Sequence, residues 1–234
     1  MDENTKFSFK GELSKLKVMG FKEKREYIWE YYKIPIIAGV ILLFIIGSLI
    51  NSWFINPPKQ NYVSVGWVSG YESYENVTLL EDELTVAIVD DLERQTVYVP
   101  TFFQTGEPQT DMVMGQRLAA MMSVGDLNAL LLDKAAIDTM AENEMIIPIE
   151  SFLEEAYALN PGLEEKIANA GDMAYAAYVS DDAEAGSERL FGVPVGNCPL
   201  FERLGLYERE LYFCVIPMTQ KRSEAAKALV AMYE

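Results

Sequence analysis

The residue types that most often carry out catalysis are sparse in this chain. It contains no histidine, which excludes Ser-His-Asp and Cys-His catalysis and every His-ligated zinc or iron site built from this chain alone. Carboxylates are abundant, but no pair of them is singled out as the acid and base of a hydrolase. We therefore expect a non-enzymatic protein without a cofactor. A hydrolase that uses acidic residues is the least favoured alternative.

The chain has two cysteines, Cys198 and Cys214. In an oxidising exterior they could form one disulfide bond. The alternative is that both are small buried hydrophobic residues. The spacing alone does not decide between the two interpretations.

Groups of acidic side chains and a row of methionines are the candidate metal ligands. Carboxylate oxygens suit calcium, but none of the acidic groups has the spacing of an EF-hand loop, so solvated loops are the favoured interpretation. The methionine row is better explained as core packing than as a copper site. We therefore predict no metal site. The acidic groups are Glu81–Asp82–Glu83, Asp90–Asp91 and Asp181–Asp182–Glu184, and the methionines are Met114, Met121 and Met122.

One uncharged run dominates the N-terminal part of the chain. From Ile34 to Asn56 there are 23 residues without Asp, Glu, Lys or Arg. A bilayer core of about 30 Å needs about 20 helical residues. A signal-peptide apolar region has about 7–15 residues and ends at a small-residue site, whereas this run ends in Trp53, Phe54 and Ile55. We predict a permanent transmembrane helix over 34–55 that contacts membrane lipid.

The charges on either side of this run predict its orientation. Eight basic side chains precede it, and Lys59 is the only basic residue between the run and Arg94. The positive-inside rule therefore places the N-terminus in the cytoplasm and the remainder outside the cell. We expect a cytoplasmic basic and aromatic segment (1–33), the membrane helix (34–55), a short stalk (56–61) and one extracellular domain (62–234). The basic segment either lies on the inner membrane surface or continues into the span.

The extracellular part is strongly acidic. The first 33 residues carry eight basic and six acidic side chains of the chain's 19 and 36, which leaves 11 basic and 30 acidic, a net charge of −19, beyond them. Such a surface repels nucleic acid. We therefore expect no nucleic-acid partner.

The first half of this domain is predicted to alternate between strands and helices. Strands are expected at Tyr62–Gly70, Leu84–Asp91 and Gln95–Phe103, the last two as a hairpin. A helix over 111–123 follows, with Leu118 on its apolar side. A buried strand at 127–132 and a helix over 134–144 come next, and Ser151 with Glu154 predicts a capping box for another helix.

The second half continues the same pattern. Residues 163–190 are expected to hold a helix and an acidic loop, and "FGVPV" (191–195) and "LYFCVIP" (211–217) read as buried strands. An amphipathic helix closes the chain, with Ala225, Leu229 and Tyr233 inward and Lys227 outward. The helix–strand–helix order predicts an α/β layer with parallel strands.

These segments resemble the extracellular solute-binding proteins of ABC transporters, of the sugar-binding type. The similar text is "AAMMSVGDLNALLLDKAAIDTMAENEMIIPIESFL", then "LFGVPV" and "LYFCVIPMTQKRSEAAKALVAMY", in the family's order within 62–152 and 190–233. The N-terminal text "KLKVMGFKEKREYIWEYYKIPIIAGVILL" resembles the membrane-anchoring start of uncharacterised proteins from clostridia-like Gram-positive bacteria. About 37 residues separate "PIESFL" from "FGVPV", which leaves room for one lobe of a periplasmic-binding-protein-like fold.

A ligand face, if the domain has one, is expected at the C-terminal ends of the parallel strands. The aromatic ring of Trp67 could stack on a sugar, or it could pack in the core. Asp133 could accept hydrogen bonds from sugar hydroxyls, or it could cap the following helix. The candidate ligand-binding residues are Trp67, Ser69, Tyr71, Phe103, Asp133 and Asn197.

Taken together, the sequence predicts a single-pass membrane protein whose non-catalytic extracellular α/β domain is a binding or interaction module. Its partner would be another membrane or cell-wall protein. The alternative is a true receptor for a small polar solute such as a sugar, which would feed a transporter or a sensor. Trp67 and Asp133 distinguish the two: both pointing into one cleft favours a receptor, whereas both buried or capping favours a module.

Overall fold

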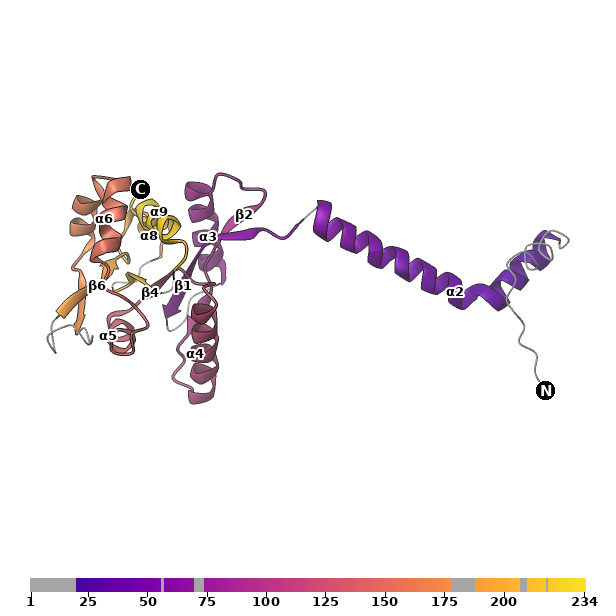
Figure 1. The fold of residues 1–234 in the computed structure, drawn as a ribbon, viewed down its shortest axis with the longest axis horizontal. Coiled ribbons are helices and arrows are strands. Elements are labelled where there is room, and N and C mark those ends of the chain that lie inside the picture. The colour runs from indigo at the N-terminus through magenta and orange to yellow at the C-terminus, as the bar shows by residue number, and fades with distance from the viewer. Residues whose placement is uncertain (1–19, 56, 70–73, 178–187, 207–209, 218) are drawn as a thin grey trace. The chain divides into compact units, whose positions relative to one another are not determined.

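The structure, a computed structural model, describes residues 20–55, 57–69, 74–177, 188–206, 210–217 and 219–234. It divides into two compact units, Met1–Pro58 and Lys59–Glu234 (Figure 1).

The described part of the first unit is one long helix. Helix α2 (Phe21–Ile50) continues as a π-helical turn, η1 (Asn51–Ile55). Together they form a helix long and apolar enough to cross a membrane, and none of its apolar window is buried within the protein. Because α2 starts at Phe21, residues 21–33 of the basic and aromatic segment continue into the apolar run as one helix. The carboxylate of Glu23 accepts a hydrogen bond from the Gly20 N–H at the first turn (3.1 Å).

The second unit is built around one mixed sheet. In the described part of this unit the sheet has seven strands, namely β1 (Gln60–Ser69), β2 (Gln95–Tyr98), β3 (Thr101–Phe103), β4 (Ala129–Leu132), β5 (Ala174–Ala177), β6 (Glu188–Pro194) and β7 (Tyr212–Val215). Their order is β2-β1-β4-β7-β6-β5. Strand β2 pairs with the first half of β1 and β3 with its second half.

Strand direction decides which ends meet at each edge of the sheet. Strand β1 is parallel to β2, β3 and β4, whereas β7 is antiparallel to both β4 and β6. It follows that β6 runs in the same direction as β1 and β4. The carboxyl ends of β1, β3, β4 and β6 therefore lie along one edge. The predicted parallel arrangement is confirmed for β1 and β4, and the antiparallel β5 and β7 make the sheet mixed.

Helices cover both faces of this sheet (Figure 1). One face packs against the first core, which draws apolar side chains from α3, α6, α7, α8 and α9, and the other packs against the second core, with side chains from α4 and α5. The helices are α3 (Tyr74–Ile88), α4 (Pro108–Ser123), α5 (Lys134–Glu142), α6 (Glu150–Leu159), α7 (Leu163–Ala170), α8 (Pro199–Leu204) and α9 (Arg222–Met232).

The alternation of residues along β1 explains its position in the middle of the sheet. Val63, Val65 and Trp67 are fully buried in the first core, and Val68 points into the second core. Successive side chains of a strand point to opposite faces, so a strand with apolar residues on both sides is stable only between two covered faces.

The closing helix α9 seals the first core. Ala225, Leu229 and Tyr233 are all fully buried, as the helical pattern predicts. The Tyr233 hydroxyl donates a hydrogen bond to the Pro194 carbonyl oxygen at the end of β6. Lys227 faces outward and donates to the Tyr62 hydroxyl (2.9 Å). The end of the chain is thereby fixed to both β1 and β6.

Two predicted strand features are wrong. Residues 84–88, predicted as a strand, form the last turns of α3, so the hairpin with 95–103 does not exist. Val77, Leu80 and Leu84 are buried at helical spacing, and this longer helical pattern outweighs the β-branched residues after Leu84. The region expected as a helix and loop after Leu163 contains the additional strand β5. The rest of that loop, 178–187, lies outside the described residues.

The capping box predicted for α6 is also wrong. The helix begins at Glu150 with Ile149 as its N-cap, and no side chain caps it. Ser151 lies inside the first turn, where its hydroxyl oxygen accepts a hydrogen bond from Arg222 on α9 (2.8 Å). Its side chain therefore joins two helices and does not satisfy the backbone of one.

Candidate binding face at the strand ends

Four of the six predicted ligand-binding residues lie along one edge of the sheet. Ser69 ends β1 and pairs with Phe103, which ends β3. Asp133 follows β4 directly, and Asn197 lies just after β6. Because these strands share a direction, their ends gather at the same edge, as expected for the carboxyl ends of parallel strands. Tyr71 lies outside the described residues.

Trp67 lies two residues before this edge, but its side chain belongs to the first core. It is fully buried, and its ring packs against that of Phe201 with centroids 5.6 Å apart at an interplanar angle of 53°. Its indole Nε1 is buried without a hydrogen-bond partner in the described structure. The ring therefore cannot stack on a solute without rearrangement of the core, and the core-packing interpretation holds.

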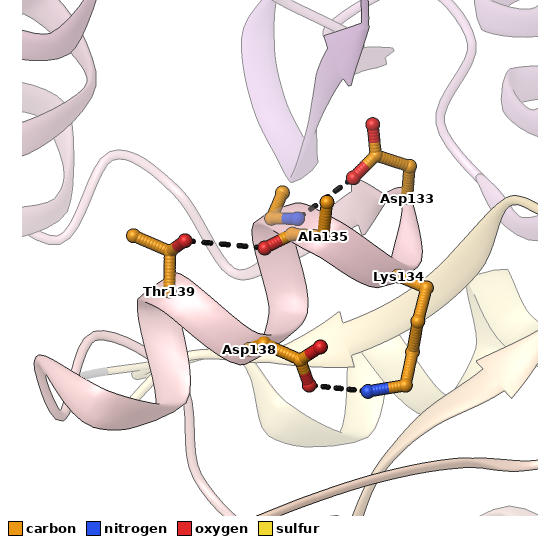
Figure 2. Close-up of polar contacts among 6 residues, drawn as sticks. Asp133, Lys134, Ala135, Asp138 and Thr139 are labelled. Atoms are coloured by element: carbon orange, nitrogen blue, oxygen red, sulfur yellow. Dashed lines mark hydrogen bonds and ion pairs between the residues drawn. The ribbon is translucent and has the colours of Figure 1, made fainter.

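Asp133 caps helix α5. Its Oδ1 accepts a hydrogen bond from the Ala136 N–H at 2.7 Å (Figure 2). This is the expected use of an aspartate at an N-cap, where it satisfies a backbone N–H without a partner in the helix. In the next turns Lys134 pairs with Asp138, and the Thr139 hydroxyl donates to the Ala135 carbonyl oxygen (3.1 Å). The polar side chains that begin α5 thus stabilise the helix itself.

Phe103 is half-buried and Asn197 is exposed in the turn between β6 and α8. The domain's apolar groove lies elsewhere. Trp67 and Asp133 thus do not converge on one cleft, because one is in the core and the other caps a helix.

The apolar groove of the domain lies at the opposite edge of the sheet, where β7 ends and α4 leads into β4. Its volume is about 260 Å³. Sequence reasoning missed it, because Met122 was interpreted as part of the core while its side chain is only half-buried. The lining residues are Ala119, Met122, Ser123, Glu144, Met145, Ile216 and Pro217.

The described residues give no support to a metal site. No group of three or more Cys, Asp or Glu side chains comes together among them. Glu81 to Glu83 lie within α3, and the acidic group at 181–184 lies outside the described residues. Glu81 is occupied structurally: its carboxylate accepts a hydrogen bond from the Val99 N–H (2.8 Å). Burial raises the pKa of Glu81 above its ordinary value, against the opposing effect of this hydrogen bond.

Cys198 and Cys214 are both free and buried. Cys198 belongs to the first core and Cys214 to the second core, so the sheet separates them. Burial raises the pKa of the Cys198 thiol to about 11 and that of Cys214 further in the same direction. The disulfide bond considered from the sequence is not formed, and the alternative of two small buried residues describes the structure.

Comparison with known proteins adds no constraint on the function. No protein-family model matches this chain, and no curated protein matches its sequence.

Proposed function

We propose that this chain is a single-pass membrane protein whose α/β domain is displayed outside the cell as a non-catalytic binding or interaction module. The domain corresponds to one lobe of a solute-binding protein that no longer closes on a solute. Its partner is another membrane or cell-wall protein. Helix α2 holds the domain at the membrane, with the basic N-terminal segment in the cytoplasm.

The observation that carries this proposal is that Trp67 and Asp133 both have structural roles. The Trp67 ring, which could have stacked on a sugar, is fully buried, and the Asp133 carboxylate, which could have bound hydroxyls, caps α5. Small-molecule sites are concave and have a few converging polar groups. Asp133 and Asn197 are exposed at this edge, which suits a broad contact with a protein better than the enclosure of a small ligand.

The anchoring part of the proposal is supported by the physical properties of α2. The helix is exposed along its whole length, although it carries most of the chain's large exposed apolar side chains. Such a surface is unstable in water and stable in lipid. The excess of basic residues before the apolar run favours a cytoplasmic N-terminus.

The test is thermal unfolding of the full chain in lipid nanodiscs with sugars, amino acids, short peptides and Ca²⁺. A bound ligand at 100 times its Kd stabilises a domain by about 2.7 kcal/mol, which is several degrees in Tm. We expect no shift with any of these compounds. In the same assay, Asp133→Ala lowers the free energy of unfolding by about 1 kcal/mol, because the cap is lost, and Asp133→Asn restores most of it.

A solute receptor is the second candidate, because Ser69, Phe103, Asp133 and Asn197 do gather at one edge. It predicts a saturable Tm shift with one polar solute, which Asp133→Ala abolishes. That result would replace the module with the receptor. The absence of any shift, together with the stability loss expected of a cap, would support the module.

A further inference from the structure

Helix α4 presents an uncharged stripe to solvent. Met112, Gly115, Gln116, Ala119 and Ser123 are all exposed, and Met112 is 63% exposed. Residues at these spacings lie on one side of a helix. The stripe extends over about three turns. A continuous uncharged surface of this kind is unusual on a domain with 30 acidic side chains.

The apolar groove opens at the C-terminal end of this stripe. Ala119 and Ser123 belong to both, and the rest of the lining consists of the apolar Met122, Met145, Ile216 and Pro217 and the exposed Glu144. Met112 stands ten residues before Met122, which is about 15 Å along the helix. An exposed apolar side chain and an apolar groove therefore lie on the same side of one helix.

We propose that two copies of this chain pair through α4, antiparallel about a two-fold axis, so that Met112 of each copy sits in the groove of the other. A two-fold axis makes every contact reciprocal. When the axis passes between Gln116 and Ala119, Met112 of one helix lies opposite Ser123 of its partner. Each Met112 side chain then contacts the groove of the other copy, so the pair has two equivalent contacts, one on each side of the axis.

The charges of α4 fit a second copy as the occupant. Near a two-fold axis a charged residue faces its own copy, so a self-associating acidic domain needs an uncharged contact surface. Between Met112 and Val124 the one charged residue is Arg117. Its guanidinium lies over the Phe102 ring (5.3 Å) and donates to the Thr101 carbonyl oxygen (3.3 Å), within its own domain. Antiparallel packing also places the opposite dipole ends of the two helices together.

The size of the contact predicts where pairing occurs. One pair of 16-residue helices buries less surface than the roughly 1,600 Å² of a standard stable interface. Two copies held in one bilayer by α2 meet at a much higher effective concentration than free domains do. Pairing at the membrane rests on the anchoring proposed above, whereas the α4 contact itself goes beyond that proposal.

Crosslinking of single-cysteine variants of the full chain in vesicles tests the pairing. Both native cysteines are buried, so an introduced surface cysteine is the reactive one. We expect Gln116→Cys to give a crosslinked dimer with a short bismaleimide. The matched control, Glu154→Cys on the exposed side of α6, does not. No dimer with Gln116→Cys, or equal dimer with both variants, overturns the proposal.

A charge placed in the contact provides the second arm. Adding Ala119→Glu to Gln116→Cys puts two carboxylates near the axis and lowers the dimer yield about tenfold or more. The matched control is Ala158→Glu, an exposed alanine on α6, which leaves the yield unchanged. Met112→Glu is a second disrupting variant. Because Met112 faces solvent, this substitution leaves the fold of the domain unaffected. Persistence of the dimer in both disrupting variants contradicts the α4 contact.

Flotation of the same samples with vesicles separates the two proposals. A chain that floats but gives no Gln116→Cys dimer overturns the pairing alone, whereas a chain that does not float overturns the anchoring. Flotation decides the anchoring by α2.

Discussion

Buried polar atoms near the strand ends are used to hold the fold together. Asn128 is buried, and its side-chain oxygen accepts a hydrogen bond from the Ser64 N–H (2.9 Å). The Arg222 side chain is only half-buried; it lies against the Phe152 ring (5.8 Å), donates a hydrogen bond to the Ser151 hydroxyl oxygen (2.8 Å) and forms an ion pair with Glu155 (2.7 Å). A buried polar group without such a partner destabilises the fold. Trp67 Nε1 is one of the exceptions among the described residues.

Buried thiols and phenols make the domain sensitive to alkali. Burial raises the pKa of Cys198 from its ordinary 9.0 to about 11, and it also raises the pKa values of Cys214 and Tyr233. In this window the folded state binds more protons than the unfolded state, so the free energy of unfolding falls as pH rises. From pH 9 to 11, we expect a loss of about 2 kcal/mol from Cys198 alone.

Urea unfolding measured by Trp67 fluorescence, in a background with Trp29→Phe and Trp53→Phe, checks this expectation. Cys198→Ala should lose less stability than the parent over the same pH range. Equal losses in the parent and in Cys198→Ala would show that the Cys198 thiol is not the group that titrates.

At the scale of elements, the strands and the helices above them pack closely at defined glycines. A Cβ added at Gly192 on β6 would lie 2.9 Å from Tyr212 Cβ and 3.0 Å from Ile137 Cδ1. We expect Gly192→Ala to lower the free energy of unfolding by about 1–3 kcal/mol, because the sheet and α5 must move apart. Gly115 in α4 has no atom within 4 Å of its added Cβ, so Gly115→Ala should stabilise the domain by about 1 kcal/mol.

Both variants are measured by urea unfolding in dilute detergent. A Gly192→Ala variant as stable as the parent would contradict the packing described for β6 and α5, and a loss of stability in Gly115→Ala would contradict the open space at that position.

The sequence could predict those elements whose local pattern and burial agree. The alternation of β1, the apolar run of β4 and the inward face of α9 all specify structures that the fold then buries. The prediction from sequence failed at α3. Val86 is β-branched, which favours a strand, but it is an exposed residue in the last turns of a helix. At Ser151 the capping-box motif is present, but the hydroxyl oxygen accepts a hydrogen bond from Arg222, which is distant in sequence, and does not cap the helix. Local patterns do not contain such distant partners.

The same limit applies to the candidate site. The parallel direction of the strands could be predicted from the sequence. That direction places Ser69, Phe103, Asp133 and Asn197 at one edge of the sheet. The direction of the Trp67 ring and the groove beside α4 depend on residues more than 50 positions apart in sequence, such as Phe201 and Ile216. Their packing is set by the tertiary fold.

For the whole molecule, the charge distribution and the apolar helix α2 are the two features on which the proposed location depends. A net charge of −19 beyond the first 33 residues keeps copies soluble and disfavours nucleic acid. The apolar helix precedes this domain, and its basic end lies on the N-terminal side. We propose that α2 is retained as an anchor with the acidic domain outside the cell.

Labelling of intact cells with a membrane-impermeant maleimide tests that claim most directly. The variants are Glu165→Cys, at an exposed position in α7, and Lys10→Cys in the N-terminal segment. The parent chain is the control, because both of its cysteines are buried. We expect labelling of Glu165→Cys in intact cells, labelling of Lys10→Cys only after permeabilisation, and a full-length chain in the membrane fraction. The reverse labelling pattern, or a released domain that has lost α2, would contradict the account.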